Sequence, residues 1–273
     1  MKPKSQSTIA EAPGRPRQLT RQRRISELVA DDLRKRILSG DLADGELLPK
    51  QEELLEEYGI SPPSIREALG ILETEGLMTV QRGRIGGGVV HRPQPSKVAY
   101  MIGLVLQSRA VDLGDLVDAM RWLEPACAAA AARRPDRHTT VLPRLRANMD
   151  EGMAAIEDSD TWIRLARQYH MELVAHCGNE TMSLVVGALE ALWSAQVDLH
   201  AREGANHGSF SDSTTRRSMA AEHETLYRLI SEGDAEGAER CVHEHYSGVS
   251  KTPAGQKHGF DHTATVDATR LRH

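Results

Sequence analysis

The chain has 273 residues, a formal net charge of −5 and an aromatic content of only 4%. This length favours two domains, and the sequence contains no run of about 18 apolar residues that would span a membrane. Ala, Leu, Glu and Arg recur throughout, so the composition favours a mainly α-helical protein with an aliphatic core over a β-sandwich.

The three cysteines, Cys127, Cys177 and Cys241, lie far apart among helical residues. This spacing favours reduced thiols over a disulfide framework. The basic N-terminus has no apolar stretch behind it, which excludes a secretory signal. We therefore expect a cytoplasmic protein that does not associate with a membrane.

Positive charge is concentrated at the N-terminus. Residues 1–24 contain one acidic residue, Glu11, and the basic residues Lys2, Lys4, Arg15, Arg17, Arg21, Arg23 and Arg24. We expect residues 1–21 to form a disordered basic arm that attracts a polyanion such as DNA. A solvated tail without a binding role is the alternative.

Residues 22–92 predict three helices followed by a β-hairpin. The first helix runs from Ile25 and ends at Gly40, and the second is short and ends at Gly59. The third begins with Ser61 as N-cap and Pro62 in the first turn, and ends before Gly76. Two strand-like runs, at 77–80 and 88–91, then flank a basic, glycine-rich tip. This order predicts a winged helix-turn-helix.

In such a domain the third helix enters the major groove and the wing holds phosphates. Arg66, one turn into the third helix, is suited to contact guanine or phosphate in two-point fashion. A surface ion pair with Glu67 or Glu73 is its alternative role. The wing residues Arg82, Gly83 and Arg84 favour phosphate contact, although glycines also simply make turns.

Beyond the hairpin the prolines of residues 93–98 predict a linker, and residues 99–250 show helical spacing almost throughout. The expected helices cover residues 113–132, 142–156, 162–177, 182–200, 219–231 and 235–247. Six or more helices predict an all-helical bundle. We expect residues 251–273 to form a disordered tail.

The stretch "GELLPKQEELLEEYGISPPSIREALGILETEGLMTVQRGRIGGGVV" resembles the winged-helix domain of GntR-family bacterial transcription regulators. The resemblance implies DNA contacts by Lys50, Ser61, Ser64, Arg66, Arg82, Gly83 and Arg84. Two positions depart from the family, which usually has arginine where this chain has Glu52 and Pro62. We expect Lys50 and the basic arm to compensate for these two phosphate contacts.

The later stretches "DLVDAMRWLEP", "QYHMELVAHCGN", "AAEHETLYRLISEGDAEGA" and "CVHEHY" resemble the FCD effector domain of FadR-like GntR members. This resemblance implies dimerisation and a small organic-acid effector. It places Arg121 where the family often directs a guanidinium at the effector, and a bidentate contact would recognise a carboxylate. An intrahelical ion pair with Asp118 or Glu124 is the alternative.

The same resemblance implies a divalent metal held by an aspartate and three histidines. His170, His223 and His245 match the histidines, whereas the aspartate position, one turn before His170, is Ala166. Three imidazoles suit Zn²⁺, or Ni²⁺ or another borderline metal, with water or the effector's carboxylate in the vacant position. The alternative is an empty polar pocket lined by hydrogen-bonded histidines.

The sequence as a whole predicts a homodimeric, non-enzymatic regulator that binds an inverted-repeat operator in double-stranded DNA. A small carboxylate in the helical domain would change its operator affinity. A helical dimerisation or scaffold protein is one alternative, and a metal-dependent hydrolase that uses the histidines is another. The effector, the operator sequence and the direction of regulation stay open.

Overall fold

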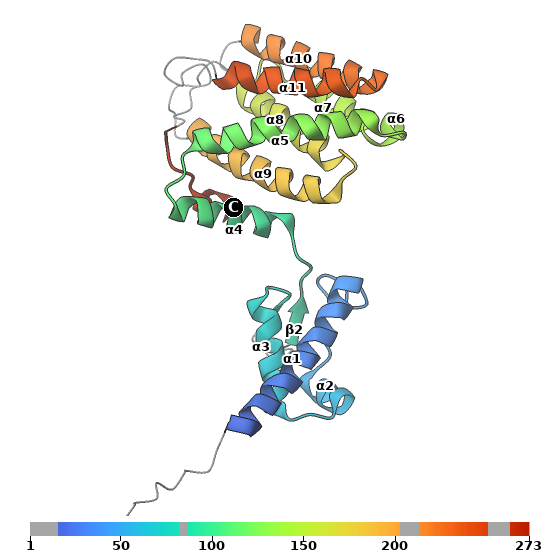
Figure 1. Cartoon of the computed structure of the whole chain (residues 1–273), viewed down its shortest axis with the longest axis vertical. Helices are drawn as coiled ribbons and strands as arrows, with labels where there is room; N and C mark the ends of the chain where they lie inside the picture. The colour runs from blue at the N-terminus through green and yellow to red at the C-terminus, as the bar shows by residue number, and fades with distance from the viewer. Residues whose placement is uncertain (1–15, 82–86, 203–212, 251–262, 273) are drawn as a thin grey trace, which may run out of the picture. The chain divides into compact units, whose positions relative to one another are not determined.

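The computed structural model describes residues 16–81, 87–202, 213–250 and 263–272, and the chain divides into two compact units, Met1–Pro93 and Gln94–His273. The first unit contains α1 (Pro16–Ser39), α2 (Gln51–Tyr58), α3 (Pro62–Thr74), β1 (Met78–Gln81) and β2 (Gly87–Val90) (Figure 1). The second contains α4 (Pro95–Ser108), α5 (Leu113–Arg133), α6 (Arg137–Thr140), α7 (Leu142–Ala154), α8 (Ser159–Ala175), α9 (Glu180–Arg202), α10 (Ser213–Glu232), α11 (Ala235–Ser250) and the 3-10 helix η2 (Ala268–Arg272). This architecture confirms the expected fold class, a winged helix-turn-helix followed by a helical bundle.

The first unit is built around the packing of α1 against α3. Leu33 and Ile37 of α1 and Ile65 of α3 are fully buried in one cluster with Leu54 of α2. The short α2 ends at Gly59, whose positive φ of 61° gives the left-handed conformation that stops a helix. The expected helix-turn-helix is thus present at residues 51–74.

An antiparallel hairpin follows α3, with Met78 opposite Val90 and Gln81 opposite Gly87. Val90 is also bonded to the segment before α2. Its N–H donates to the carbonyl of Glu46 at 2.8 Å. This contact fixes the base of the hairpin to the helices. The expected tip residues Arg82, Gly83 and Arg84 lie outside the described residues.

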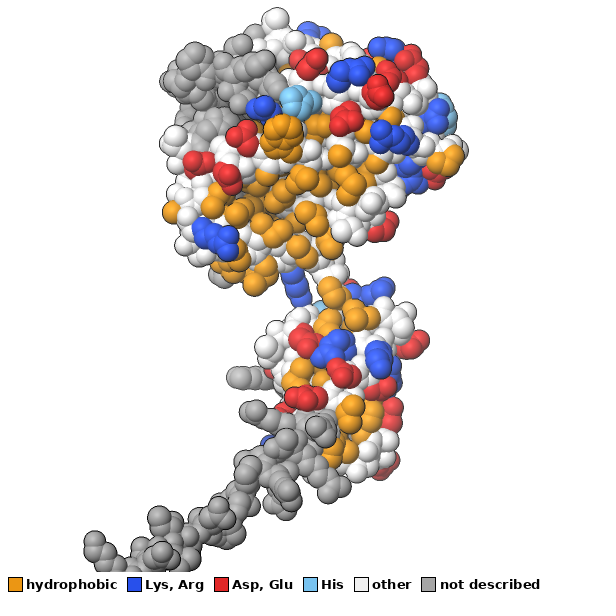
Figure 2. Space-filling model, viewed as in Figure 1, with side chains coloured by type: hydrophobic (Ala, Val, Ile, Leu, Met, Phe, Trp, Pro, Cys, Tyr) orange, Lys and Arg blue, Asp and Glu red, His pale blue; other side chains and the backbone are white. Residues whose placement is uncertain are grey.

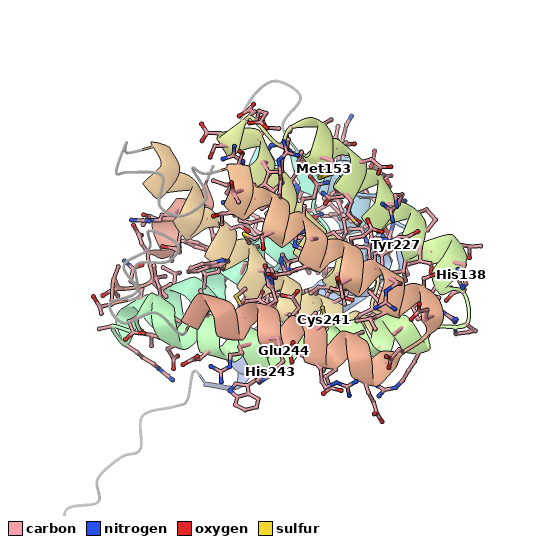
Figure 3. The ribbon with its side chains drawn as sticks, turned by 90° about the horizontal axis from the view of Figure 1, so that it is seen from above. His138, Met153, Tyr227, Cys241, His243 and Glu244 are labelled. Carbon is pink, nitrogen blue, oxygen red and sulfur yellow. The ribbon has the colours of Figure 1, made fainter. Side chains whose placement is uncertain are left out.

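The second unit is a bundle whose most extensive helix pair is α5 with α11. Small side chains on the inner side of α5, including Ala128, Ala131 and Ala132, allow α11 to approach closely through Ala238 and Val242. α10 and α11 lie side by side (Figure 3). Within the described residues no helix is long and apolar enough to cross a membrane.

Three expected segment boundaries are wrong. α1 begins at Pro16 rather than after residue 21, because proline is well tolerated in the first turn of a helix. The same property places Pro95 in the first turn of α4, so most of the expected 93–98 linker is helical. Residues 263–272 of the expected tail are packed on the bundle, with Val266 and Ala268 buried. Residues 1–15 and 251–262 lie outside the described residues.

Leu33 provides a test of the first unit's core. Replacement by Ala should lower the free energy of unfolding by about 2–5 kcal/mol, because the fully buried side chain leaves a cavity between α1 and α3. Leu28→Ala on the same helix is the matched control, since Leu28 is 64% exposed. Urea unfolding of both variants measures the difference, and equal losses would contradict the assigned core.

Candidate functional site

The exposed end of α3 carries the first candidate site. Ser61 is the N-cap residue and Arg66 is exposed one turn later, with its Nε 3.5 Å from the carbonyl oxygen of Pro62. Among the described residues Arg66 has no ion pair, so the alternative pairing with Glu67 or Glu73 is absent there. The guanidinium of Arg66 therefore remains available for a nucleic acid.

Other proposed DNA contacts differ in exposure. Lys50 is exposed at the N-terminus of α2, two residues before the exposed Glu52. Ser64 is buried, and its hydroxyl lies 3.0 Å from the hydroxyl of Ser61. Its position one turn before Ala68 places it on the core side of α3, so the structure gives no support for a direct DNA contact by Ser64.

The second candidate site lies in the bundle, where α8, α10 and α11 bring three histidines together. One ring nitrogen from each of His170, His223 and His245 lies within 4.8 Å of the other two. The space that they line has a volume of about 10 Å³, which suits a single ion or water molecule. The three matched positions of the sequence thus form one cluster.

Carboxylates fix two of the three rings. Nδ1 of His170 lies 2.5 Å from Oε1 of Glu124, and Nδ1 of His245 lies 2.6 Å from Oε2 of Glu222. Each ring consequently keeps Nε2 for another partner. A histidine that bonds a carboxylate through one nitrogen and a metal through the other is the usual arrangement in metalloproteins.

His223 is held differently. Its ring stacks on Tyr169 with centroids 4.1 Å apart, and the Tyr169 hydroxyl donates to the backbone carbonyl of His223 at 3.1 Å. Its Nε2 is buried without a hydrogen-bond partner. Burial, together with the charges of His170 and His245, lowers the pKa of His223 well below its ordinary value. The His223 ring is therefore neutral, and a neutral imidazole binds a metal through its unprotonated nitrogen.

Glu124 lies beneath the cluster and is fully buried. The Tyr246 hydroxyl donates to Glu124, and its oxygen lies 2.9 Å from Oε1 of Glu190 on α9. Burial alone would raise the pKa of Glu124, but the charge and hydrogen bond of His170 outweigh it and hold this pKa below its usual range. For Glu190, burial and the neighbouring charge of Glu124 raise the pKa well above its usual range. The two carboxyl groups thus share one negative charge.

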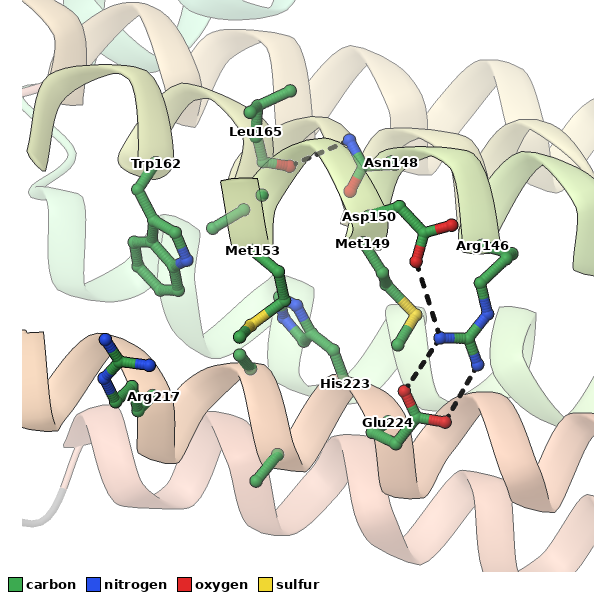
Figure 4. Close-up of a pocket in the computed structure, with 14 residues that line it drawn as sticks. Arg146, Asn148, Met149, Asp150, Met153, Trp162, Leu165, Arg217, His223 and Glu224 are labelled. Atoms are coloured by element: carbon green, nitrogen blue, oxygen red, sulfur yellow. Dashed lines mark hydrogen bonds and ion pairs between the residues drawn. The ribbon is translucent and has the colours of Figure 1, made fainter. Parts of the chain in front are cut away.

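A larger cavity of about 310 Å³ adjoins the cluster between α7, α8 and α10. Figure 4 shows Trp162, Met153 and His223 pointing into it, and Ala166 also lines it. Arg146 at its edge is bound in two-point fashion to Glu224, at 3.0 and 2.8 Å. The space beside Ala166 is therefore open to the cavity where an aspartate side chain would otherwise stand.

Arg121 does not line this cavity. Its guanidinium lies 3.7 Å from Asp118 one turn earlier, which is one of the expected intrahelical partners, while Glu124 bonds to His170 instead. Its Nε is buried without a hydrogen-bond partner. The effector-binding role of Arg121 stays a prediction.

The sequence reasoning missed Glu124, Glu190, Glu222 and Tyr246. Only Glu124 left a signal, because its helical position continues the buried positions Leu116 and Met120. A carboxylate at an apolar position implies a buried partner. That partner, His170, lies 46 residues away in the sequence, and the helical periodicity of α5 does not identify it.

The first unit is a winged helix-turn-helix with an exposed arginine on α3, and the second is a helical domain with a histidine cluster beside a cavity. This combination defines a DNA-binding transcription regulator with an attached sensory domain. Residues 25–85 match the family model described as bacterial regulatory proteins, gntR family, and residues 115–248 match the FCD domain. The chain belongs to the GntR family and carries an FCD domain.

Known relatives agree with this assignment. The chain is 24% identical over 233 residues to the HTH-type transcriptional repressor NanR of Salmonella schwarzengrund, with 84% of each chain covered. The same identity and coverage relate it to the NanR repressor of Salmonella typhimurium. The structure is similar to that of Streptococcus agalactiae GntR, with a TM-score of 0.60 and 20% identity over 83% of this chain and 100% of that one. The last likeness concerns the fold alone.

The bond between Glu124 and His170 generates a prediction for metal affinity. If the cluster binds Zn²⁺ as the resemblance implies, Glu124→Gln should weaken that binding by about 10–100-fold, because His170 loses the anionic acceptor that orients its ring and raises its basicity. A competition titration with a chromophoric chelator measures the change. Glu172→Gln is the control, since Glu172 pairs with His176 outside the cluster. Equal affinities in the two variants would contradict this role of Glu124.

Proposed function

We propose that this regulator binds a divalent metal at His170, His223 and His245, and that a small carboxylate in the adjoining cavity changes its affinity for DNA. The observation that carries the proposal is that His223 lines both the metal-sized space and the larger cavity, while its Nε2 is buried without a hydrogen-bond partner. A buried polar atom without a partner is unfavourable, so the site is suited to an added ligand.

Zn²⁺ suits three neutral imidazoles, although Ni²⁺ or another borderline metal would also fit. Bound metal would supply a Lewis-acidic centre that attracts a carboxylate. Ala166 leaves the coordination sphere open towards the cavity, so the ligand's own carboxylate would replace the missing aspartate. The ligand acts on DNA binding only if it has unequal affinity for the DNA-competent and incompetent states.

We also infer a homodimer that binds an inverted repeat. Figure 2 shows hydrophobic side chains gathered over α4, α5 and α9. The exposed hydrophobic side chains of these helices are Met101, Leu104, Val105, Trp122, Leu123, Leu184 and Val185, with Trp122 69% exposed. An apolar surface of this kind favours association with a second copy, and two-fold symmetry would present two recognition helices to two matching half-sites.

No catalytic role is proposed. The histidines would hold a metal, but a hydrolase also needs a positioned acid or base beside an open metal position. Glu124 already bonds to His170 and Tyr246, and Glu222 to His245. The family match likewise favours regulation, and it supports a cytoplasmic protein.

Arg66 tests the DNA-binding part of the proposal. Arg66→Ala should weaken operator binding by about 1–3 kcal/mol if the guanidinium contacts a base edge. Mobility-shift titrations would use the DNA that flanks the protein's own gene. Lys35→Ala removes one exposed positive charge from α1 and serves as the control. Equal operator affinities of Arg66→Ala and the wild type would contradict the assignment of α3 as the helix that contacts the bases.

Ala166 tests the metal part. Ala166→Asp should tighten Zn²⁺ binding severalfold, because a carboxylate one turn before His170 adds an anionic ligand on the same side of α8. Metal analysis and thermal shifts with added Zn²⁺ or Ni²⁺ measure this on protein made without a histidine tag. Less than about a tenth of an equivalent of metal in the wild type, without a thermal shift, would make the three histidines structural.

A further inference from the structure

The C-terminal strap, defined as residues 263–272, lies outside both regions that match the family models. It pairs with the residues that precede α5, where Thr265 forms an antiparallel bridge with Asp112. The N–H of Leu113 donates to the carbonyl of Ala264 at 2.9 Å, and that of Val266 donates to Val111 at 3.0 Å. The strap is therefore an integral part of the bundle.

Two glutamines connect the strap to different helices. Gln196 of α9 is fully buried, and its side chain donates to the carbonyl of Asp267 at 2.9 Å and accepts from the N–H of the same residue at 3.2 Å. Gln107 of α4 accepts from the N–H of Ala268 at 3.1 Å. One turn of backbone in the strap is thus bonded to both α9 and α4.

Close packing reinforces these bonds. A Cβ placed on Gly103 of α4 would lie 3.1 Å from Ala268 of the strap and 3.1 Å from Leu192 of α9. Ala268 and Leu192 are both fully buried. α4, α9 and the strap therefore meet at a point with no spare volume, where a shift of one displaces the others.

α9 also reaches the histidine cluster. Oε1 of Glu190, six residues before Gln196, lies 2.9 Å from the hydroxyl oxygen of Tyr246. The same hydroxyl donates to Glu124, the partner of His170. A continuous series of bonds therefore runs from His170 to α9, then through Gln196 and the strap to α4. Networks of hydrogen bonds and packed helices of this kind carry energetic coupling between sites.

We propose that the C-terminal strap transmits the metal-bound state of the histidine cluster to α4, the helix that follows the DNA-binding unit in the chain. The proposal rests on metal binding at that cluster. Metal binding fixes the ring of His170 and with it the carboxylates of Glu124 and Glu190, which are bonded through Tyr246. A shift of Glu190 moves α9 as a rigid helix. The strap makes α4 move with α9, because Gln196 and Gln107 would both lose their hydrogen bonds to the strap if α9 and α4 slid apart.

Hydrogen–deuterium exchange of the full-length protein, with and without Zn²⁺, tests this coupling. In the wild type, Zn²⁺ should slow exchange of the amides in α8, α10 and α11 and also in α4. Gln196→Ala and the milder Gln107→Ala should bind the same amount of Zn²⁺ and keep the response of α8, α10 and α11. Both should lose the response of α4.

Thr269→Ala is the control, because it removes a bond to Asp267 within the strap and leaves both glutamine contacts in place. It should respond as the wild type does. If the strap only stabilises the bundle, the two glutamine substitutions would raise exchange in α4 equally with and without Zn²⁺, and Zn²⁺ would still slow exchange in α4. This retained response of α4 would overturn the proposal. Failure of the wild type to bind Zn²⁺ would overturn the metal site and the coupling together.

Discussion

A fully buried carboxylate, that of Glu124, is the constraint on which the helical domain depends. An ionised carboxylate without partners is strongly unfavourable inside a protein, so α8, α9 and α11 must each present a polar group to α5. They do so with His170, Glu190 and Tyr246. The same contacts that satisfy Glu124 hold His170 of the histidine cluster, so the stability of the domain and its proposed metal binding share one set of bonds.

In the proposed metal site, this arrangement explains how three imidazoles suffice without the aspartate that the resemblance to FCD domains implies at position 166. Glu124 and Glu222 place negative charge next to the rings, because they bond to Nδ1 of His170 and of His245. Charge placed there orients the rings and leaves the position beside Ala166 open. A ligand that approaches through the cavity would therefore meet an exposed coordination position instead of a filled one.

Much of the fold was predictable because it depends on local signals. Helical periodicity located most helices of both domains but not α4, whose first turn was expected to be linker. Ser61, Pro62 and Gly59 marked the boundaries of α2 and α3. The strap at 263–272 was not predictable, since its burial comes from Gln196 and Gly103, which are remote in sequence. The histidines were identified by resemblance, but their carboxylate partners depend on contacts across 46 and 23 residues, for which a single sequence holds no periodic signal.

The first turn of α2 carries a consequence for how the protein searches DNA. Glu52 and Glu53 lie there, and Glu53 accepts a hydrogen bond from the backbone N–H of Lys50 at 2.9 Å. Negative charge at this end of a helix stabilises it, yet Glu52 would repel phosphate at a position where the resemblance to the GntR family implies an arginine. A protein with one phosphate contact fewer releases about one counterion fewer when it binds DNA. Non-specific affinity for DNA depends almost wholly on this release of counterions. The protein would thus spend less time on random sequence, and its occupancy of a true operator would depend more on base recognition.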